Sequence, residues 1–277
     1  MNKNVDWQKI ELDFKEKGFL SAGTSLFQEH FRTAMSDWFK LAEELNELGQ
    51  RIYVENADQV LGKSVMSPIS LVLLMMPRCL SGFQGAIILA ERGLGIEAQS
   101  LIRNIYETTF WMGYISQNHD DAIPQLRRET LTSEIGLFET SLKHLNQMSP
   151  DTKEEVERRI NEMREDRDAL PKPPKIEKLA ALSGYEKNYF FYKELSGAAT
   201  HLSMKSIHIF LEKNADGDPV GHQIGPDEEA VGKAVWLGCR AMVLAIDVVQ
   251  RILNRMEYDD ELSRLNERIL ELEPFKG

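Results

Sequence analysis

The sequence predicts an all-α protein, and three observations lead to that class. Apolar residues recur at the three- and four-residue spacing of amphipathic helices along most of the chain. Weak strand character is confined to residues 207–211, and the one clear break is a proline-rich stretch at 171–174. A chain of 277 residues with 42% hydrophobic residues is also long enough to bury a sizeable core. We therefore expect a single multi-helix bundle.

In the first half of the chain, helices are expected wherever the apolar period continues. Ser67-Pro68 is typical of an N-cap followed by proline at the first helical position, and Pro77 is expected to kink the helix that starts there. Gly93-Leu94-Gly95 predicts a turn before the next helix. The expected helices cover residues 21–53, 68–92, 96–117 and 120–147, with a loop at 54–66.

The second half is expected to continue the same bundle after a stiff connector, Pro171-Lys172-Pro173-Pro174. The connector is short and the helices after it are too few to form a core alone, so residues 1–277 are predicted to form one domain. An irregular segment or small hairpin is expected near 206–225. Helices are expected at residues 151–168, 176–183, 186–204, 226–256 and 259–272.

Composition argues against several partners and locations. A net charge of -11 and a pI near 5.2 repel nucleic acid and anionic lipid, so neither is expected as a partner. The most apolar stretch, residues 69–90, contains Arg78, and an arginine inside a membrane is energetically costly. The stretch is therefore predicted to be a helix that is buried within the protein on all of its sides, rather than a membrane span. Two isolated cysteines, Cys79 and Cys239, and a charged N-terminal segment favour a reducing cytoplasm.

Sequence patterns for common cofactors are incomplete. Gly93-x-Gly95-x-x-Ala98 imitates a dinucleotide-binding loop, but it follows a predicted helix where that loop requires a strand. Val220 occupies a ligand position in the segment near Asp216 that imitates a calcium loop. The histidines lack the spacing of metal ligands. We therefore expect no metal and no cofactor.

Arg103 and Glu107 form the first half of a candidate site. They are the only charged residues between Ala98 and Gln117, and they lie one helical turn apart among apolar residues. This pattern predicts a buried ion pair, from which removal of one partner would cost about 3 to 5 kcal/mol. Two interpretations stay open: the pair is structural, or it lines an interhelical pocket where the guanidinium holds an anion.

The second half of the candidate site follows the connector, where four aromatic residues at 189–192 lead to a small-residue segment and then to His201. Small side chains permit close helix approach, and a histidine can exchange a proton near neutral pH. His201 is interpreted either as a core or capping residue or as an acid–base group. The candidate ligand-binding residues are Arg103, Glu107, Tyr192, Ser196 and His201, and His201 is the candidate catalytic residue.

Two segments resemble the signature segments of a bacterial family catalogued as domain of unknown function 5677. They are the run 101–107 with Tyr114, and the later residues Tyr189, Tyr192, Ser196 and His201. The resemblance covers residues 69–211 and implies an all-helical bacterial protein of unsettled activity. It extends distantly to the HEPN superfamily of helical ribonucleases, whose motif places an arginine, a polar residue and a histidine on one helix. Arg103-Asn104 begins that motif, but the first histidine downstream is His119.

Two function classes remain. The first is a binding or interaction module, compatible with a homodimer, whose cluster is structural or binds a small anionic ligand. The second is a metal-independent ribonuclease or nucleotide hydrolase, in which Arg103 stabilises phosphate charge and His201 acts as acid or base. The acidic net charge and the incomplete HEPN motif favour the first class.

Overall fold

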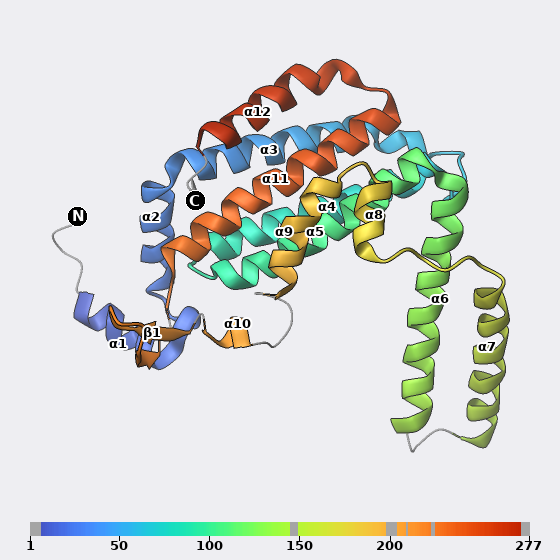
Figure 1. Ribbon diagram of the computed structural model, residues 1–277, viewed down its shortest axis with the longest axis horizontal. Helices are drawn as coiled ribbons and strands as arrows, with labels where there is room; N and C mark the ends of the chain where they lie inside the picture. Colours follow the sequence, from blue (N-terminus) through green and yellow to red (C-terminus); the bar gives the residue numbers. More distant parts are fainter. Residues whose placement is uncertain (1–6, 145–148, 198–203, 209, 223–224, 273–277) are drawn as a thin grey trace.

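The computed structural model describes residues 7–144, 149–197, 204–208, 210–222 and 225–272. Helices dominate these ranges, so the predicted all-α class is confirmed (Figure 1). The strands of the described part are β1 (Leu211–Lys213) and β2 (Pro219–His222), which pair in an antiparallel hairpin. This hairpin lies in the segment predicted to be irregular or a small hairpin. The strand character expected at 207–211 was misplaced, because residues 207 and 208 belong to the short helix α10 (Met204–His208).

The body of the protein is built around one long helix, α11. It packs against α3, α4 and α5, and α12 covers α3 and α11 (Figure 1). Asp227 caps the start of α11 by accepting hydrogen bonds from the backbone N–H groups of Glu229 and Ala230. Asn254, in the left-handed conformation, ends it. The helices of the body are α3 (Ser36–Asn56), α4 (Pro68–Glu91), α5 (Gly95–Gln117), α11 (Glu228–Leu253) and α12 (Asp259–Glu271).

The helix predicted over 21–53 is in fact two helices, α2 (Thr24–Ala34) and α3. The chain leaves helical geometry at Met35, where φ is -120° and ψ is 35°. The apolar period continues through this break, and periodicity does not reveal a change of direction. The new direction lets Arg32 form ion pairs with Glu43 and Glu91. Shorter N-terminal elements are α1 (Trp7–Lys17), η1 (Gly18–Leu20) and η2 (Ala57–Val60), the last inside the predicted loop.

Local sequence signals set the ends of α4 and α5. Ser67 caps α4 by accepting a hydrogen bond from the backbone N–H of Ser70, as the Ser67-Pro68 pair predicts. Gly93 has φ of +88°, which favours glycine, and a side chain at Gly95 would collide with the backbone of Ala230 in α11. The glycines that imitate a dinucleotide-binding loop therefore make a tight turn and a close helix contact.

Helix α4 is not buried on all sides, contrary to the sequence prediction. Its inner face contributes to the core, but Leu74 and Ile88 on its outer face are each 53% exposed. Among the described helices α4 alone is long and apolar enough to cross a membrane, judged by length and composition. Only 39% of its most apolar window is buried, so this helix presents an apolar surface as well as a core face.

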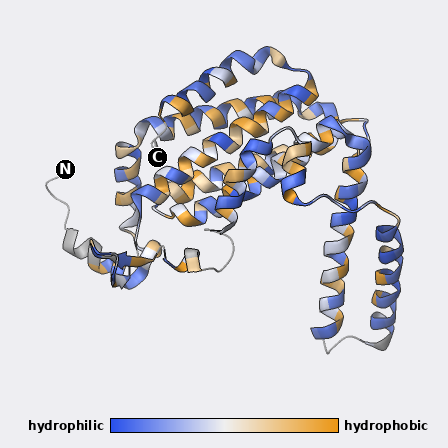
Figure 2. Cartoon of the chain, viewed as in Figure 1, coloured by the Kyte–Doolittle hydropathy of each residue, from blue (hydrophilic) through white to orange (hydrophobic). Residues whose placement is uncertain are grey.

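A helical hairpin, α6 (His119–His144) and α7 (Pro150–Asp168), projects from the body (Figure 1). Figure 2 shows that most residues of α7 are hydrophilic, whereas α6 mixes hydrophilic and hydrophobic residues. Ser149 caps α7 by accepting a hydrogen bond from the backbone N–H of Thr152. The connector at 171–174 has no regular structure and returns the chain to the body. The following helices are α8 (Ile176–Leu182), η3 (Glu186–Asn188) and α9 (Tyr189–Leu195). Both α8 and α9 pack against α5, which brings the second predicted segment to the first.

Candidate functional site

Four of the five predicted site residues lie together where α9 crosses α5. Arg103 Nη1 donates a hydrogen bond to Glu107 Oε2 at 3.0 Å, and Arg103 Nη2 donates to Tyr192 Oη at 2.5 Å. Arg103 Nε donates to Ser196 Oγ at 2.9 Å. One guanidinium therefore joins residues that are 89 and 93 positions apart in the chain. The fifth residue, His201, lies outside the described residues.

The hydrogen bonds of this cluster have a defined direction. Tyr192 Oη accepts from Arg103 and donates to Glu107 Oε2 at 3.4 Å. Burial, and then the negative charge of Glu107, raise the pKa of Tyr192, so the phenol keeps the proton that it donates. Ser196 Oγ donates to the carbonyl of Tyr192 at 2.8 Å and accepts from Arg103. The arginine is thus held on three sides before any ligand binds.

The prediction of a fully buried ion pair was wrong. The Arg103 side chain is 16% exposed, and the Glu107 side chain is 40% exposed. The apolar sequence of α5 hid this difference, because α5 is covered by α4, α9 and α11 but not around its whole circumference. The pair lies at the edge of the bundle, where solvent and small solutes can reach it.

A pocket of about 400 Å³ opens beside the cluster, between α4 and α5. Arg103 and Glu107 both border it. Tyr192 and Ser196 do not border the pocket, but both accept hydrogen bonds from Arg103. We call this space the α4–α5 pocket. Its lining residues are Met75, Arg78, Arg103, Asn104, Glu107, Thr108 and Trp111.

Sequence reasoning missed Arg78 as a site residue. It is the only charged residue from Pro68 to Ala90, and that isolation was a usable signal. Its side chain borders the pocket, and within the described ranges it forms no ion pair or hydrogen bond. The pocket therefore combines two guanidinium groups with one carboxylate, in a chain whose net charge is -11.

Comparison with known proteins identifies the chain's family. The model of a family of unknown function, DUF5677, matches residues 70–218, which is more than half of the 277 residues. The chain belongs to the DUF5677 family. No curated protein and no solved structure matches it.

The DUF5677 match spans α4, α5, the α6–α7 hairpin, α8 and α9, and therefore includes the whole candidate site. It ends before α11, although α11 supplies much of the core against which α4 and α5 pack. The residues matched by the family model thus hold the polar cluster, while a helix outside the match supports it.

The aromatic run of the DUF5677 segment holds α9 between two arginines. The guanidinium carbon of Arg103 lies 4.6 Å from the centre of the Tyr192 ring, and that of Arg240 in α11 lies 4.8 Å from the centre of the Phe191 ring. Phe191 also stacks on the buried Tyr106 at 6.3 Å between ring centres. These contacts fix the position from which Tyr192 holds Arg103.

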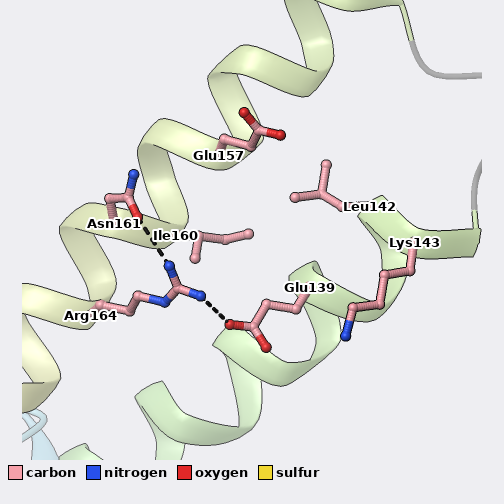
Figure 3. A pocket seen from close by; sticks show the side chains of 7 residues that line it. All are labelled: Glu139, Leu142, Lys143, Glu157, Ile160, Asn161 and Arg164. Carbon is pink, nitrogen blue, oxygen red and sulfur yellow. Dashed lines mark hydrogen bonds and ion pairs between the residues drawn. The ribbon is translucent and has the colours of Figure 1, made fainter.

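A second pocket, of about 480 Å³, lies between α6 and α7 and differs in its electrostatics. Figure 3 shows that its arginine, Arg164, donates to Glu139 at 2.6 Å and to Asn161 at 3.2 Å. Lys143 and Glu157 complete a lining with equal numbers of basic and acidic residues. This pocket has no surplus of either charge.

Neither pocket offers a recognisable metal site. Within the described ranges, no group of three histidine, cysteine, aspartate or glutamate residues is placed to hold a metal ion. Cys79 and Cys239 are buried as free thiols, and burial raises the pKa of Cys79 to about 12. The polar groups that the candidate site offers to a ligand are therefore the guanidinium groups of the two arginines, the carboxylate of Glu107 and the phenol of Tyr192.

Proposed function

We propose that this DUF5677 protein is a binding module whose α4–α5 pocket holds a small organic anion. The observation that carries the proposal is the pair of guanidinium groups, Arg78 and Arg103, bordering one small pocket with a single carboxylate. Arginine binds carboxylate and phosphate groups through planar, charge-assisted hydrogen bonds. The pocket has one more positive than negative group, so it attracts anions, whereas the protein as a whole is strongly acidic and repels them.

The two arginines would serve the anion in different ways. Arg103 is held in place by Tyr192, Ser196 and Glu107, so it loses little conformational freedom when a ligand binds. Arg78 has no such contacts among the described residues and is free to reorient toward the ligand. One preorganised and one adaptable guanidinium together suit a monovalent or divalent group of small size.

The remaining lining residues favour an anion attached to a flat, apolar group. Trp111 and Met75 provide aromatic and thioether surface, and the Asn104 side chain adds hydrogen-bonding capacity. A volume of about 400 Å³ is within the range of small-molecule sites. An aryl carboxylate or aryl phosphate fits this combination better than a bare inorganic ion.

Calorimetric titration with benzoate, phenyl phosphate and inorganic phosphate tests the proposal. The aryl anions are expected to bind more tightly than inorganic phosphate, and Arg78→Gln is expected to weaken them by about tenfold, equivalent to about 1.4 kcal/mol. Glu107→Gln is expected to strengthen binding, because it removes the carboxylate that competes for the arginines. Misfolding would weaken anion binding in both variants, so it cannot explain weaker binding in Arg78→Gln together with stronger binding in Glu107→Gln.

Arg92→Gln is the matched control, since Arg92 is exposed at the end of the same helix but does not border the pocket. The proposal fails if none of the three anions binds, or if Arg92→Gln weakens binding as much as Arg78→Gln. Release of phosphate from phenyl phosphate, or cleavage of an RNA oligonucleotide, that is lost in Arg103→Lys would instead support the hydrolase alternative.

A further inference from the structure

A third pocket, of about 390 Å³, lies at the base of the α6–α7 hairpin, where the hairpin joins the body (Figure 1). Its lining comes from the end of α5, the first turns of α6, the connector at 171–174 and α8. None of the described residues lines both this pocket and the α4–α5 pocket. We call it the hairpin-base pocket, and it is a site separate from the one proposed above.

Three charged side chains border the hairpin-base pocket, and their signs are divided between elements. Asp121 belongs to the first turn of α6, whereas Lys172 belongs to the connector and Lys178 to α8. Within the described ranges none of the three forms an ion pair, although they surround one small space. The lysines are therefore farther from the carboxylate than the distance of about 4 Å that defines an ion pair. A ligand between them can contact both signs of charge at once.

The carboxylate of this pocket is held in place by its neighbours. Asp121 Oδ2 accepts a hydrogen bond from Asn118 Nδ2 at 2.9 Å, which orients the carboxylate and leaves Oδ1 for a ligand. Tyr114 borders the same pocket and is buried. Burial, and then the negative charge of Asp121, raise the pKa of Tyr114, so its phenol stays neutral beside the carboxylate. The wall formed by α5 and α6 therefore presents a single negative charge.

The opposite charge is carried by side chains that can adapt to a ligand. Lys172 and Lys178 are exposed, and a lysine has a long flexible stem and a compact ammonium group. The remaining wall is apolar, because Pro173 and Pro174 of the connector and Leu182 of α8 also border the pocket. The two prolines restrict the backbone of the connector, so this apolar wall is stiff.

We propose that the hairpin-base pocket binds a free α-amino acid with an apolar side chain. Its ammonium group pairs with Asp121, its carboxylate pairs with Lys172 and Lys178, and its side chain lies against the apolar wall. A simple anion would satisfy the lysines but be repelled by Asp121, and a simple cation would face two lysines. A volume of about 390 Å³ is within the range of small-molecule sites.

Calorimetric titration of the full-length protein with L-alanine, L-valine and L-leucine tests the proposal. Two further probes keep the hydrocarbon chain of leucine: 4-methylpentanoate lacks its ammonium group, and 3-methylbutylamine lacks its carboxylate. L-Leucine is expected to bind at least about tenfold more tightly than either probe, because each probe loses one of the two charge-assisted contacts.

Substitutions on two different elements locate the amino acid. Asp121→Asn and Lys178→Gln are each expected to weaken L-leucine binding about tenfold, since each removes one charge partner. Asp120→Asn and Lys175→Gln are the matched controls, because both residues are exposed close to these positions in the chain but do not border the pocket. The controls are expected to bind L-leucine like the wild type. Circular dichroism melting verifies that each variant is folded.

The proposal is overturned if none of the three amino acids binds at concentrations up to about 10 mM. It is also overturned if 4-methylpentanoate displaces L-leucine at equal concentration, or if the control variants weaken binding as much as Asp121→Asn and Lys178→Gln. Arg78→Gln is expected to leave L-leucine binding unchanged, since Arg78 borders only the α4–α5 pocket. Loss of L-leucine binding in Arg78→Gln would place the amino acid in the α4–α5 pocket instead, and benzoate binding tests that pocket independently.

Discussion

The body of the protein and its projecting α6–α7 hairpin both consist of long helices with arginine–carboxylate contacts. The two regions differ in how far apart in the chain the residues joined by an arginine lie. In the hairpin, Arg158 pairs with Glu155 and Glu162, which lie within one turn of it on the same exposed helix. In the body, Arg103 joins α5 to Tyr192 and Ser196, which are 89 and 93 positions away. Ion pairs between neighbouring turns form as soon as the helix itself forms. The hydrogen bonds of Arg103 form only when the tertiary fold brings α9 to α5.

The two regions also differ in how their helices are stabilised. Most apolar side chains of α11 are buried, while in α6 and α7 the buried residues are Ala122, Ile135 and Ile160. Several hairpin contacts instead join its two helices: Arg164 of α7 pairs with Glu139 of α6, and Arg128 of α6 donates to the carbonyls of Arg167 and Leu170 at the end of α7. Substitutions of similar chemistry should therefore have much larger effects in the body than in the hairpin.

The largest expected difference concerns glycine. Gly95→Ala places a methyl group against the backbone of Ala230, where no flexible side chain can yield, so the free energy of unfolding is expected to fall by about 2 to 3 kcal/mol or more. Urea denaturation at constant slope measures this loss. A stability equal to that of the wild type would show that α5 and α11 can separate without cost.

The next expected effect is that of Arg103→Ala, a loss of about 1 to 3 kcal/mol. The variant leaves the buried Tyr192 hydroxyl without its donor, but the exposed fraction of Glu107 allows water to hydrate its carboxylate. In the hairpin, Arg164→Ala removes an exposed pair with Glu139 and is expected to cost less than about 1 kcal/mol. Equal losses in the two denaturation curves would contradict the distinction between the regions.

Alkaline pH should also separate the regions. Burial raises the pKa of Cys79 to about 12, whereas an unfolded thiol has a pKa of about 8.5. The folded state therefore keeps a proton that the unfolded state loses, so this contribution is full below about pH 8.5 and declines as pH rises toward 12. Cys79→Ala is expected to reduce the slope of stability against pH in this window. Residues 119–168 contain no cysteine or tyrosine, so substitution of Arg164 should leave the slope unchanged.

The smallest expected effect has the opposite sign. Gly136 lies within α6, and a methyl group there would meet no atom within 4 Å. Gly136→Ala is therefore expected to stabilise the protein by about 0.5 to 1 kcal/mol, through the helix propensity of alanine. Thermal denaturation followed by circular dichroism measures the gain. A loss of stability would mean that the methyl group meets other atoms, and that the hairpin is packed as tightly as the body at this position.

Sequence reasoning located the residues of the candidate cluster but not their surroundings. Arg103 and Glu107 were identifiable because they interrupt an apolar helix, and Tyr192 and Ser196 because their segment resembles a family signature. The burial assigned to the pair was wrong, since an apolar helix does not reveal which of its sides remains uncovered. Arg78 was seen only as an obstacle to membrane insertion, because nothing local indicates that α4 and α5 place it beside Arg103.

Sequence by itself determined the all-α class and the ends of helices that depend on neighbouring residues. Ser67 and Ser149 cap α4 and α7 by accepting hydrogen bonds from residues three positions further along the chain, and such bonds require no contact with a distant segment. Tertiary structure alone decided the break at Met35, the exposed face of α4 and the meeting of Arg103 with Tyr192. These features arise from contacts between distant segments, whose energies depend on how the helices pack, and the helical period is the same whichever neighbour covers a face.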